Sequence, residues 1–506
     1  MNFCDNKNKK RFYINNIALA LVYFFVFLML RYQFNIELSD FLWAEDGSVF
    51  INEAYKYGIK SLITPYYGYL HLYPRIFAYI STYFDVKFVQ VVFVLGWSVS
   101  VFALIYVSIK CLENKISNNL FRFLIVFLIL IQPSSGEIFF TLTNSQWMLG
   151  FVLVAILFFD PPIKNFYKYP IIATLSLTGP FCIFVVAVMI LDMIRYKCKR
   201  IKIEFIILIV CSLVQLFYIE SSNRLGARID NSAFDWSVAF VRLMMFGIKY
   251  NLVCFIMIGL FWSVFVVSCK IRKIDLINCN DFNTPEAKLV LSGFLFFVAS
   301  LLMSSDPIVL LSSTGPGSRY YWISYSGFII YFGLRANCLR FEKYILATIL
   351  IAVFAIQGQT IVKEKMYFDS YIKFASCVDI KIPINPAINK YPGWHVDSSL
   401  LGIKNHNCGR VSVYDDVGKK YDFKFSSKGN SLGIIINVKD YSGGVAAISI
   451  NEADGKCVSL KRYFNPLSSE LYFAYTKSTE DIIVTVRDLA NGGVNISSIK
   501  LYDLDK

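Results

Sequence analysis

The chain has 506 residues, of which 56% are hydrophobic and 17% charged, and its formal net charge is +14. A mean hydropathy of +0.52 and repeated long apolar runs exclude a large soluble fold and predict a polytopic membrane protein. The positive charge would suggest nucleic-acid binding in a soluble chain, but here it gathers between alternate apolar runs, so no nucleic-acid partner is expected.

The first apolar run covers residues 12–30 and follows a basic cluster at residues 7–11. The run is long enough to cross a bilayer, and the basic cluster predicts a cytoplasmic N-terminus. Its apolar core exceeds that of a secretory signal, and no small-residue cleavage site follows it. We therefore expect an anchor that stays in the protein.

Two adjacent acids, Glu45 and Asp46, lie in the run WAEDG, inside the predicted first external loop. A membrane enzyme can place a general base in such a loop. The alternative is structural, because Asp46 before Gly47 and Ser48 is also typical of a residue that caps a short helix. No other predicted external loop carries adjacent acids, which favours the catalytic interpretation.

Apolar runs and the Lys/Arg pattern predict eleven crossings in a membrane domain of residues 1–360. These are residues 12–30, 87–109, 119–133, 147–160, 169–179, 181–195, 203–219, 250–269, 288–304, 320–335 and 344–360. The odd number places the tail outside. The fifth and sixth crossings are short and meet at LTGPF, and a single span there would move the tail inside.

Four further motifs lie at predicted external ends: GYLHLYPRIFA (68–78), TNSQW (143–147), LTGPF (177–181) and GPGSRYYW (315–322). Each has an ordinary explanation, since Arg75 can reach lipid headgroups, Trp147 can sit in an aromatic belt and Gly-Pro can form a turn. Together they place acids, a cation and amides on one side of the membrane, around one predicted cavity.

The composition changes after residue 360. Residues 361–506 lack a spanning run and carry the β-type runs LGIIINVKD, GVAAISIN, SELYFAYT, EDIIVTVRD and VNISSIKLYD between turn signals. Such short strands predict an external, mainly-β, sandwich-like domain that is long enough to bury its own core. Cys377, Cys408 and Cys457 fall in this domain, and one disulfide among them is expected in an oxidising compartment, with the pair left open.

WAEDG, GYLHLYPRIFA, TNSQW, LTGPF and SRYYW, in this order, resemble the polytopic lipid-linked-sugar glycosyltransferases of the GT-C class. Within that class the chain resembles the phage-encoded serotype-converting O-antigen glucosyltransferases of enteric bacteria, over residues 1–360 and into KIPINPAINKYPGW (381–394). The resemblance implies an inner-membrane enzyme that takes glucose from undecaprenyl-phosphate-glucose and adds it, with inversion, to O-antigen units of lipopolysaccharide on the periplasmic face.

The resemblance places the general base on Glu45 or Asp46, and such a base contributes roughly 10²–10⁴-fold to the rate. The departing phosphate gains negative charge, which Arg319 or Arg75 would stabilise. The remaining residues expected to bind the donor phosphate or the substrate are His71, Tyr320, Asn144 and Trp147. A lipid monophosphate has no pyrophosphate to clamp, so the chemistry requires no metal or other cofactor, although it does not forbid a metal.

Two alternatives stay open: an O-antigen polymerase, and a flippase or transporter of lipid-linked saccharides. Transporters place ionisable residues near the middle of their spans, whereas Asp192 and Glu220 lie at span ends. A polymerase would change chain length rather than decoration. The tail is expected either to recognise the polymeric acceptor, with Trp394 and strand tyrosines stacking on sugar rings, or to brace the first loop.

Overall fold

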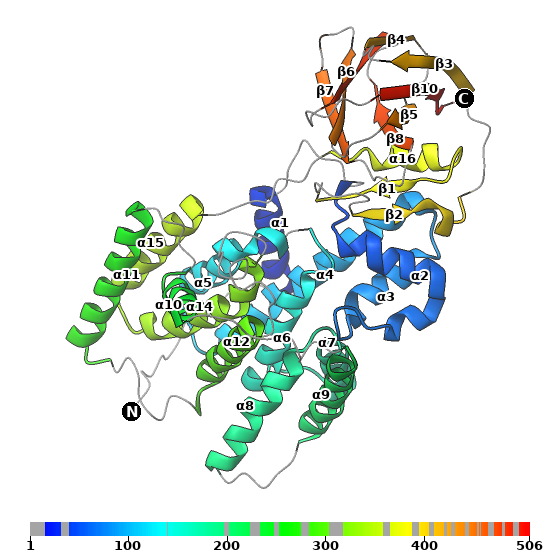
Figure 1. Ribbon diagram of the computed structural model, residues 1–506. Helices are drawn as coiled ribbons and strands as arrows, with labels where there is room; N and C mark the ends of the chain where they lie inside the picture. Colours follow the sequence, from blue (N-terminus) through cyan, green and yellow to red (C-terminus); the bar gives the residue numbers. More distant parts are fainter. Residues whose placement is uncertain are drawn as a thin grey trace.

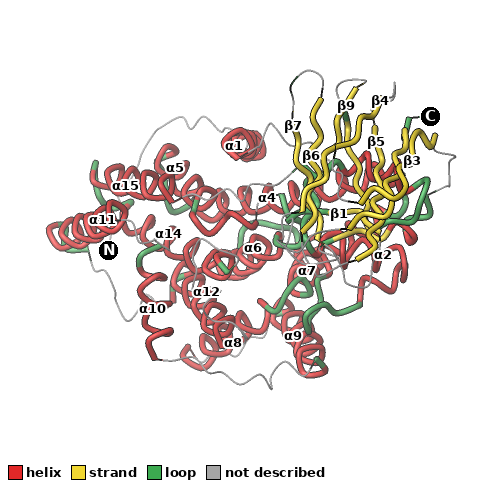
Figure 2. The backbone as a smooth tube through the Cα atoms, turned by 45° about the horizontal axis from the view of Figure 1, so that its top comes forward, coloured by secondary structure: helices red, strands yellow, loops and turns green. Residues whose placement is uncertain are grey.

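The computed structural model has a helical body with the β-strands of the tail gathered at one end of it (Figure 1). It describes residues 16–31, 40–138, 140–196, 202–222, 233–246, 252–274, 283–302, 317–357, 365–386, 394–403, 409–418, 422–426, 431–440, 445–452, 455, 457–463, 470–477, 481–488 and 495–505. Helices and strands occupy separate regions of the molecule (Figure 2).

Each of the eleven predicted apolar runs contains a helix. They are α1 (Asn16–Arg31), α4 (Val89–Glu113), α5 (Asn119–Ile131), α6 (Ser145–Phe159), α7 (Asn165–Ser176), α8 (Phe181–Tyr196), α9 (Ile203–Ser221), α11 (Leu252–Ile271), α12 (Pro285–Leu302), α14 (Trp322–Ala336) and α15 (Glu342–Gln357). Within the described ranges, four helical segments are long and apolar enough to cross a membrane: residues 86–113, α9, α11 and α12. The membrane class is thus supported, and the count of eleven crossings stays a prediction.

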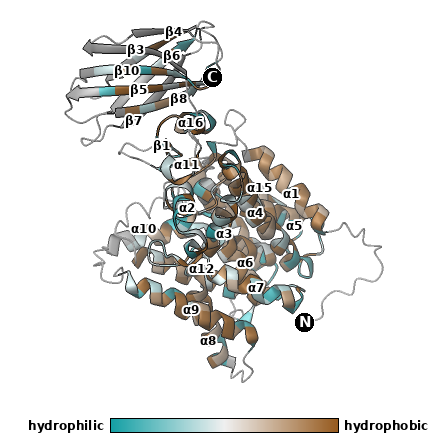
Figure 3. Ribbon diagram, turned by 90° about the vertical axis from the view of Figure 1, so that its right-hand side faces the viewer, coloured by the Kyte–Doolittle hydropathy of each residue, from teal (hydrophilic) through white to brown (hydrophobic). Residues whose placement is uncertain are grey.

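Large apolar side chains face outward along these helices, as a bilayer requires. Phe25, Leu213, Phe217 and Phe255 are more than half exposed, and hydrophobic colour covers most of α1, α8 and α9 (Figure 3). The helix α10 (Ala233–Met244) lies in a segment for which no helix was predicted.

Ion pairs gather at the helix ends that were predicted to be cytoplasmic. They join Lys110 to Glu113, Lys115 to Glu286, Lys168 to Asp160 and Glu204, Lys288 to Asp192, and Arg272 to Glu342. Lys168 marks the start of α7 and Asp192 the last turns of α8, so both helices have this end in common. The chain therefore reverses direction at LTGPF between α7 and α8, and the number of crossings that these helices make stays a prediction.

The first loop and other connections contain short helices at the opposite end of the bundle. These are η2 (Asp46–Ile51), α2 (Asn52–Tyr57), η3 (Gly58–Ile63), α3 (Leu72–Ser81), η4 (Val86–Phe88), η5 (Pro133–Ile138) and η8 (Ser318–Tyr321). Hydrogen bonds between residues 70–73 and 177–179 place LTGPF at this end too. The four motifs and WAEDG thus share one end of the helices.

The tail begins with a connecting segment, residues 365–386 and 394–403, which comprises α16 (Phe368–Ala375), β1 (Lys381–Pro383), β2 (His395–Asp397) and η9 (Ser398–Leu400). Cys377, just after α16, is disulfide-bonded, and its partner's side chain lies outside the described residues. A disulfide that includes Cys377 was one of the predicted possibilities, and a pairing with Cys408 or Cys457 stays a prediction.

The rest of the tail forms two four-stranded antiparallel sheets, in the orders β3-β10-β5-β8 and β4-β9-β6-β7. The strands are β3 (Gly409–Gly418), β4 (Asp422–Ser426), β5 (Ser431–Asp440), β6 (Val445–Glu452), β7 (Cys457–Tyr463), β8 (Glu470–Thr476), β9 (Asp481–Asp488) and β10 (Asn495–Asp503). The five predicted runs are strands β5, β6, β8, β9 and β10. Tyr475 of the first sheet donates a hydrogen bond to Glu452 of the second.

The first loop and the tail share one buried core. One buried cluster contains Phe50 of the first loop, Leu142 before α6, Phe374 of α16, Ile384 beside β1 and Ile435 of β5. The first loop, the connecting segment and the first sheet therefore pack as one unit. A larger cluster fills the interior of the helical body.

Candidate active site

Asp46 is a buried carboxylate that joins two of the predicted motifs. It is 1% exposed. Its Oδ1 accepts hydrogen bonds from the Thr143 backbone N–H at 2.8 Å and the Thr143 hydroxyl at 2.5 Å, and its Oδ2 accepts one from the Leu142 N–H at 3.3 Å. The carboxylate thus fixes the turn that leads into TNSQW. The N-cap position of η2 is Glu45, whose side chain makes no capping bond.

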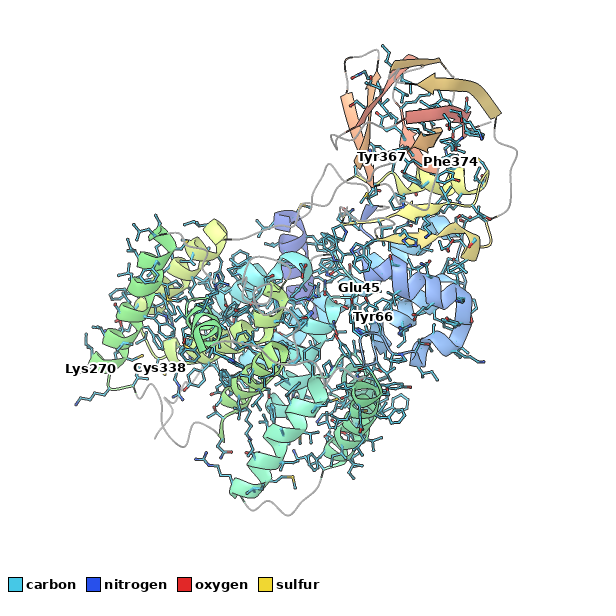
Figure 4. The ribbon with its side chains drawn as sticks, viewed as in Figure 1. Glu45, Tyr66, Lys270, Cys338, Tyr367 and Phe374 are labelled. Carbon is cyan, nitrogen blue, oxygen red and sulfur yellow. The ribbon has the colours of Figure 1, made fainter. Side chains whose placement is uncertain are left out.

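Glu45 has a different environment from its neighbour. It is half-buried, and it makes no hydrogen bond or ion pair with any residue the structure describes. Its side chain lies near Tyr66 (Figure 4), where burial first and the charge of Glu45 second raise the pKa of the Tyr66 hydroxyl. The two acids therefore have separate environments, as expected for adjacent residues.

Arg319 lies close enough to Glu45 for the two charges to interact. Its Nη1 donates to Glu137 Oε2 at 2.6 Å, and its side chain keeps 27% exposure against 8% for Glu137. Burial lowers the pKa of Arg319, but the charges of Glu137, Tyr320 and Glu45 outweigh this effect and raise it overall. Burial and the charge of Glu45 raise the pKa of Glu137, against the opposing effect of Arg319.

Asn144, Tyr320 and Trp147 surround this ion pair. Asn144 Nδ2 donates to the Glu137 carbonyl at 3.0 Å, and the Arg319 guanidinium lies 5.5 Å from the centre of the Tyr320 ring. Trp147 packs edge-on against Tyr320 at 5.0 Å and is only 3% exposed. The explanation of Trp147 as an interfacial belt residue is therefore wrong, because its ring packs behind Tyr320.

Arg75 and His71 form a second, enclosed group one helical turn apart. Arg75 is 0% exposed, donates to Glu53 Oε2 at 2.7 Å and lies 5.0 Å from the centre of the Phe50 ring. Its Nε and Nη2, and both ring nitrogens of His71, are buried without a partner in the described part of the chain. The expectation that Arg75 reaches lipid headgroups is wrong.

The protonation of His71 follows from its surroundings. Its ring packs against Tyr69 at 4.4 Å, and burial together with the charge of Arg75 lowers its pKa to about 3. The imidazole is therefore neutral at physiological pH. Unpartnered buried donors usually mark room for water or a ligand, so this group offers a polar interior beside the first loop.

Gln215 of α9 was not predicted as a site residue, yet it joins two motifs. Its Oε1 accepts from the Leu70 N–H at 2.8 Å, and its Nε2 donates to the carbonyls of Ser176 and Gly179 at 3.3 and 3.1 Å. Gly179 has φ +105°, and a Cβ there would lie 3.0 Å from Gln146 Oε1. The glycine of LTGPF is thus required by both its backbone and its neighbours.

Metal ligands do not converge in the described ranges, where no group of three His, Cys, Asp or Glu side chains is placed to hold an ion. No family model, no curated protein and no solved structure matches the chain. The function is therefore argued from the residues of the site.

Proposed function

We propose that the chain is a GT-C-like membrane glycosyltransferase that moves a glucosyl residue, with inversion, from undecaprenyl-phosphate-glucose to O-antigen repeat units on the periplasmic face. The observation that carries the proposal is that Glu45 lies close enough to Arg319 for its charge to act on the guanidinium. A half-buried carboxylate without a bonded partner in the described residues lies within electrostatic reach of a partly exposed guanidinium. Sugar transfer from a lipid phosphate needs these two groups, a proton acceptor and a cation.

In the proposed reaction Glu45 is the general base. It takes the proton of the acceptor hydroxyl while that oxygen bonds to the anomeric carbon. The bond from this carbon to the phosphate oxygen breaks on the opposite face, its electron pair leaves with the lipid phosphate, and the configuration inverts. Asp46 is less suited to this role because three donors already occupy its oxygens.

Arg319 is proposed to bind the donor phosphate. Its pairing with Glu137 holds Nη1 in place, while 27% of the side chain is exposed to an incoming ligand. A guanidinium can hold a phosphate through two parallel hydrogen bonds. Arg75, which is completely buried, fits a supporting role instead, beside the buried His71.

Two observations support the periplasmic placement. Basic residues concentrate at the end of the bundle where Lys115, Lys168 and Lys288 form ion pairs. The positive-inside pattern predicts such a concentration at the cytoplasmic end. The site lies at the opposite end, together with the disulfide-bonded Cys377, and disulfides persist in oxidising compartments such as the periplasm.

The test is the structure of the O-antigen in cells that carry the wild-type chain, Glu45→Gln or no chain. We expect glucosylated O-antigen only with the wild-type chain, and a loss of roughly 10²–10⁴-fold for Glu45→Gln at normal membrane abundance. Unchanged decoration with and without the chain would refute the proposal, and a change in chain length alone would indicate a polymerase.

A further inference from the structure

The connecting segment of the tail lies directly against the helix that follows Glu45. Ser48 Oγ donates to the His395 carbonyl at 2.9 Å and accepts from the His395 N–H at 2.7 Å. Asn52 Oδ1 accepts from the Asp397 N–H at 3.0 Å. Strand β2 is thus bonded to η2 and α2 through two polar side chains of the first loop.

Close packing accompanies these bonds. A Cβ at Gly47 would lie 2.5 Å from Ile384 Cδ1 and 2.7 Å from Val396 Cγ2, which leaves no room for a larger residue. Ile384 and Val396 are 2% and 1% exposed. The backbone of η2 therefore rests on the β1–β2 pair without a gap.

A second contact holds the residues before Glu45. The Ala44 N–H donates to the Asn385 carbonyl at 2.5 Å, and Asn385 Nδ2 donates to the Asp40 carbonyl at 2.9 Å. Ala44 has φ +39°, a left-handed conformation that a non-glycine residue adopts only when its surroundings impose it. Glu45 directly follows this residue, so the contact with Asn385 helps to set its direction.

We propose that the connecting segment is a positioning element of the candidate site, and that Ser48 is a positioning residue that holds Glu45 against the acceptor. The catalytic part of this inference rests on the proposed function. Ser48 touches no reacting group; it fixes the turn that carries one. Displacing a catalytic group by about 1 Å can lower a rate by about 10²-fold, so a loosened turn should affect turnover more than donor binding.

The test compares Ser48→Ala with Ser48→Thr in the full-length protein, in vesicles supplied with undecaprenyl-phosphate-glucose and O-antigen. Ser48→Ala should lower kcat about ten- to a hundredfold and leave the KM for the donor within about twofold. Ser48→Thr keeps the hydroxyl and should restore most of kcat. Ser98→Ala is the matched control, because the Ser98 hydroxyl bonds only within α4.

Amide hydrogen exchange tests the contact between Ser48 and His395 independently of turnover. In Ser48→Ala the His395 N–H loses its acceptor and should exchange faster, while amides of the α11 interior keep their rates. Asn52→Ala, which removes the Asn52 acceptor of the Asp397 N–H, should speed exchange at Asp397 and lower kcat. It keeps the test available if Ser48→Ala does not accumulate.

Three results would overturn the inference. Faster exchange at His395 with unchanged kcat would show a contact without a positioning role, and a raised donor KM with unchanged kcat would show a binding role instead. Unchanged exchange would refute the contact itself. Failure of the proposed function is recognised separately, because it appears as unchanged O-antigen decoration with and without the wild-type chain, whatever the exchange at His395.

Discussion

The Asp46→Asn substitution should destabilise the protein far more than Glu45→Gln. Asparagine keeps the volume of Asp46 but presents an NH2 group in place of one oxygen, so at least one of the three donors from Leu142 and Thr143 loses its acceptor. A hydrogen bond to a charged group contributes about 1.5–3 kcal/mol, and an unsatisfied buried donor costs about 1–3 kcal/mol. We expect a loss of about 2–4 kcal/mol in the free energy of unfolding.

Denaturant unfolding in detergent micelles, with a double-mutant cycle to Thr143→Val, measures this loss. Because Asp46 and the Thr143 hydroxyl share a hydrogen bond, the two changes should be non-additive by about 0.5–3 kcal/mol. Glu45→Gln is the control, and it should change stability by no more than about 0.5 kcal/mol because Glu45 has no bonded partner in the described residues.

The opposite pattern would refute the assignment of the two acids. If Asp46→Asn unfolds at the wild-type denaturant concentration but has lost transfer, then Asp46 is the base. Retention of near-normal transfer by Glu45→Gln would exclude Glu45 as the base.

Four further predictions use the same protein. Arg319→Lys, which keeps the charge but loses the fork geometry, should lose part of the transfer at limiting donor, and Arg319→Ala more; normal transfer by Arg319→Ala would rule out phosphate binding. Gln215→Leu should cost about 2–4 kcal/mol in unfolding measurements, because the Leu70 N–H loses its acceptor; an unchanged unfolding midpoint would contradict this. His71 has a folded pKa of about 3 against 6.5 unfolded, so wild-type stability should fall as the pH drops below about 6.5, and Tm measured at pH 7 and 5 should fall less in His71→Leu. A reporter fused at residue 370 should be active only outside the cytoplasm, and cytoplasmic activity would reverse the topology.

The helices could be predicted from the sequence because an apolar run is a local property of the chain. The LTGPF turn and five of the tail strands follow from local signals in the same way. Strands β3, β4 and β7 were not predicted, although the sequence of β4, DFKFS, alternates polar and apolar residues. The change of composition after residue 360 placed the connecting segment with the β domain in the prediction. In the structure this segment packs into the same core as the first loop.

The sequence predicts that the motifs of the candidate site lie at one end of the helices, but it does not predict which side chains bond to one another there. Glu137 and Gln215 act through partners 182 and 36 or more residues away, and no local pattern reveals such pairs. A single polar Gln in the apolar run 203–219 was the available signal for Gln215. The different environments of Glu45 and Asp46 follow the turn at Ala44, which a sequence of adjacent acids does not specify.

The contact between Ser48 and His395 spans 347 residues, and this separation sets an order of events during biosynthesis. At about 5–20 residues per second, a ribosome takes roughly 20–70 s to make the chain between these two positions. Throughout that interval the first loop has no β1–β2 pair to pack against, and Phe50 and Ile51 lack part of their apolar cover. The packed conformation of the loop is therefore a late product of synthesis. Under the proposed function, a nascent chain that stops before residue 395 should be inactive even though its apolar helices are complete.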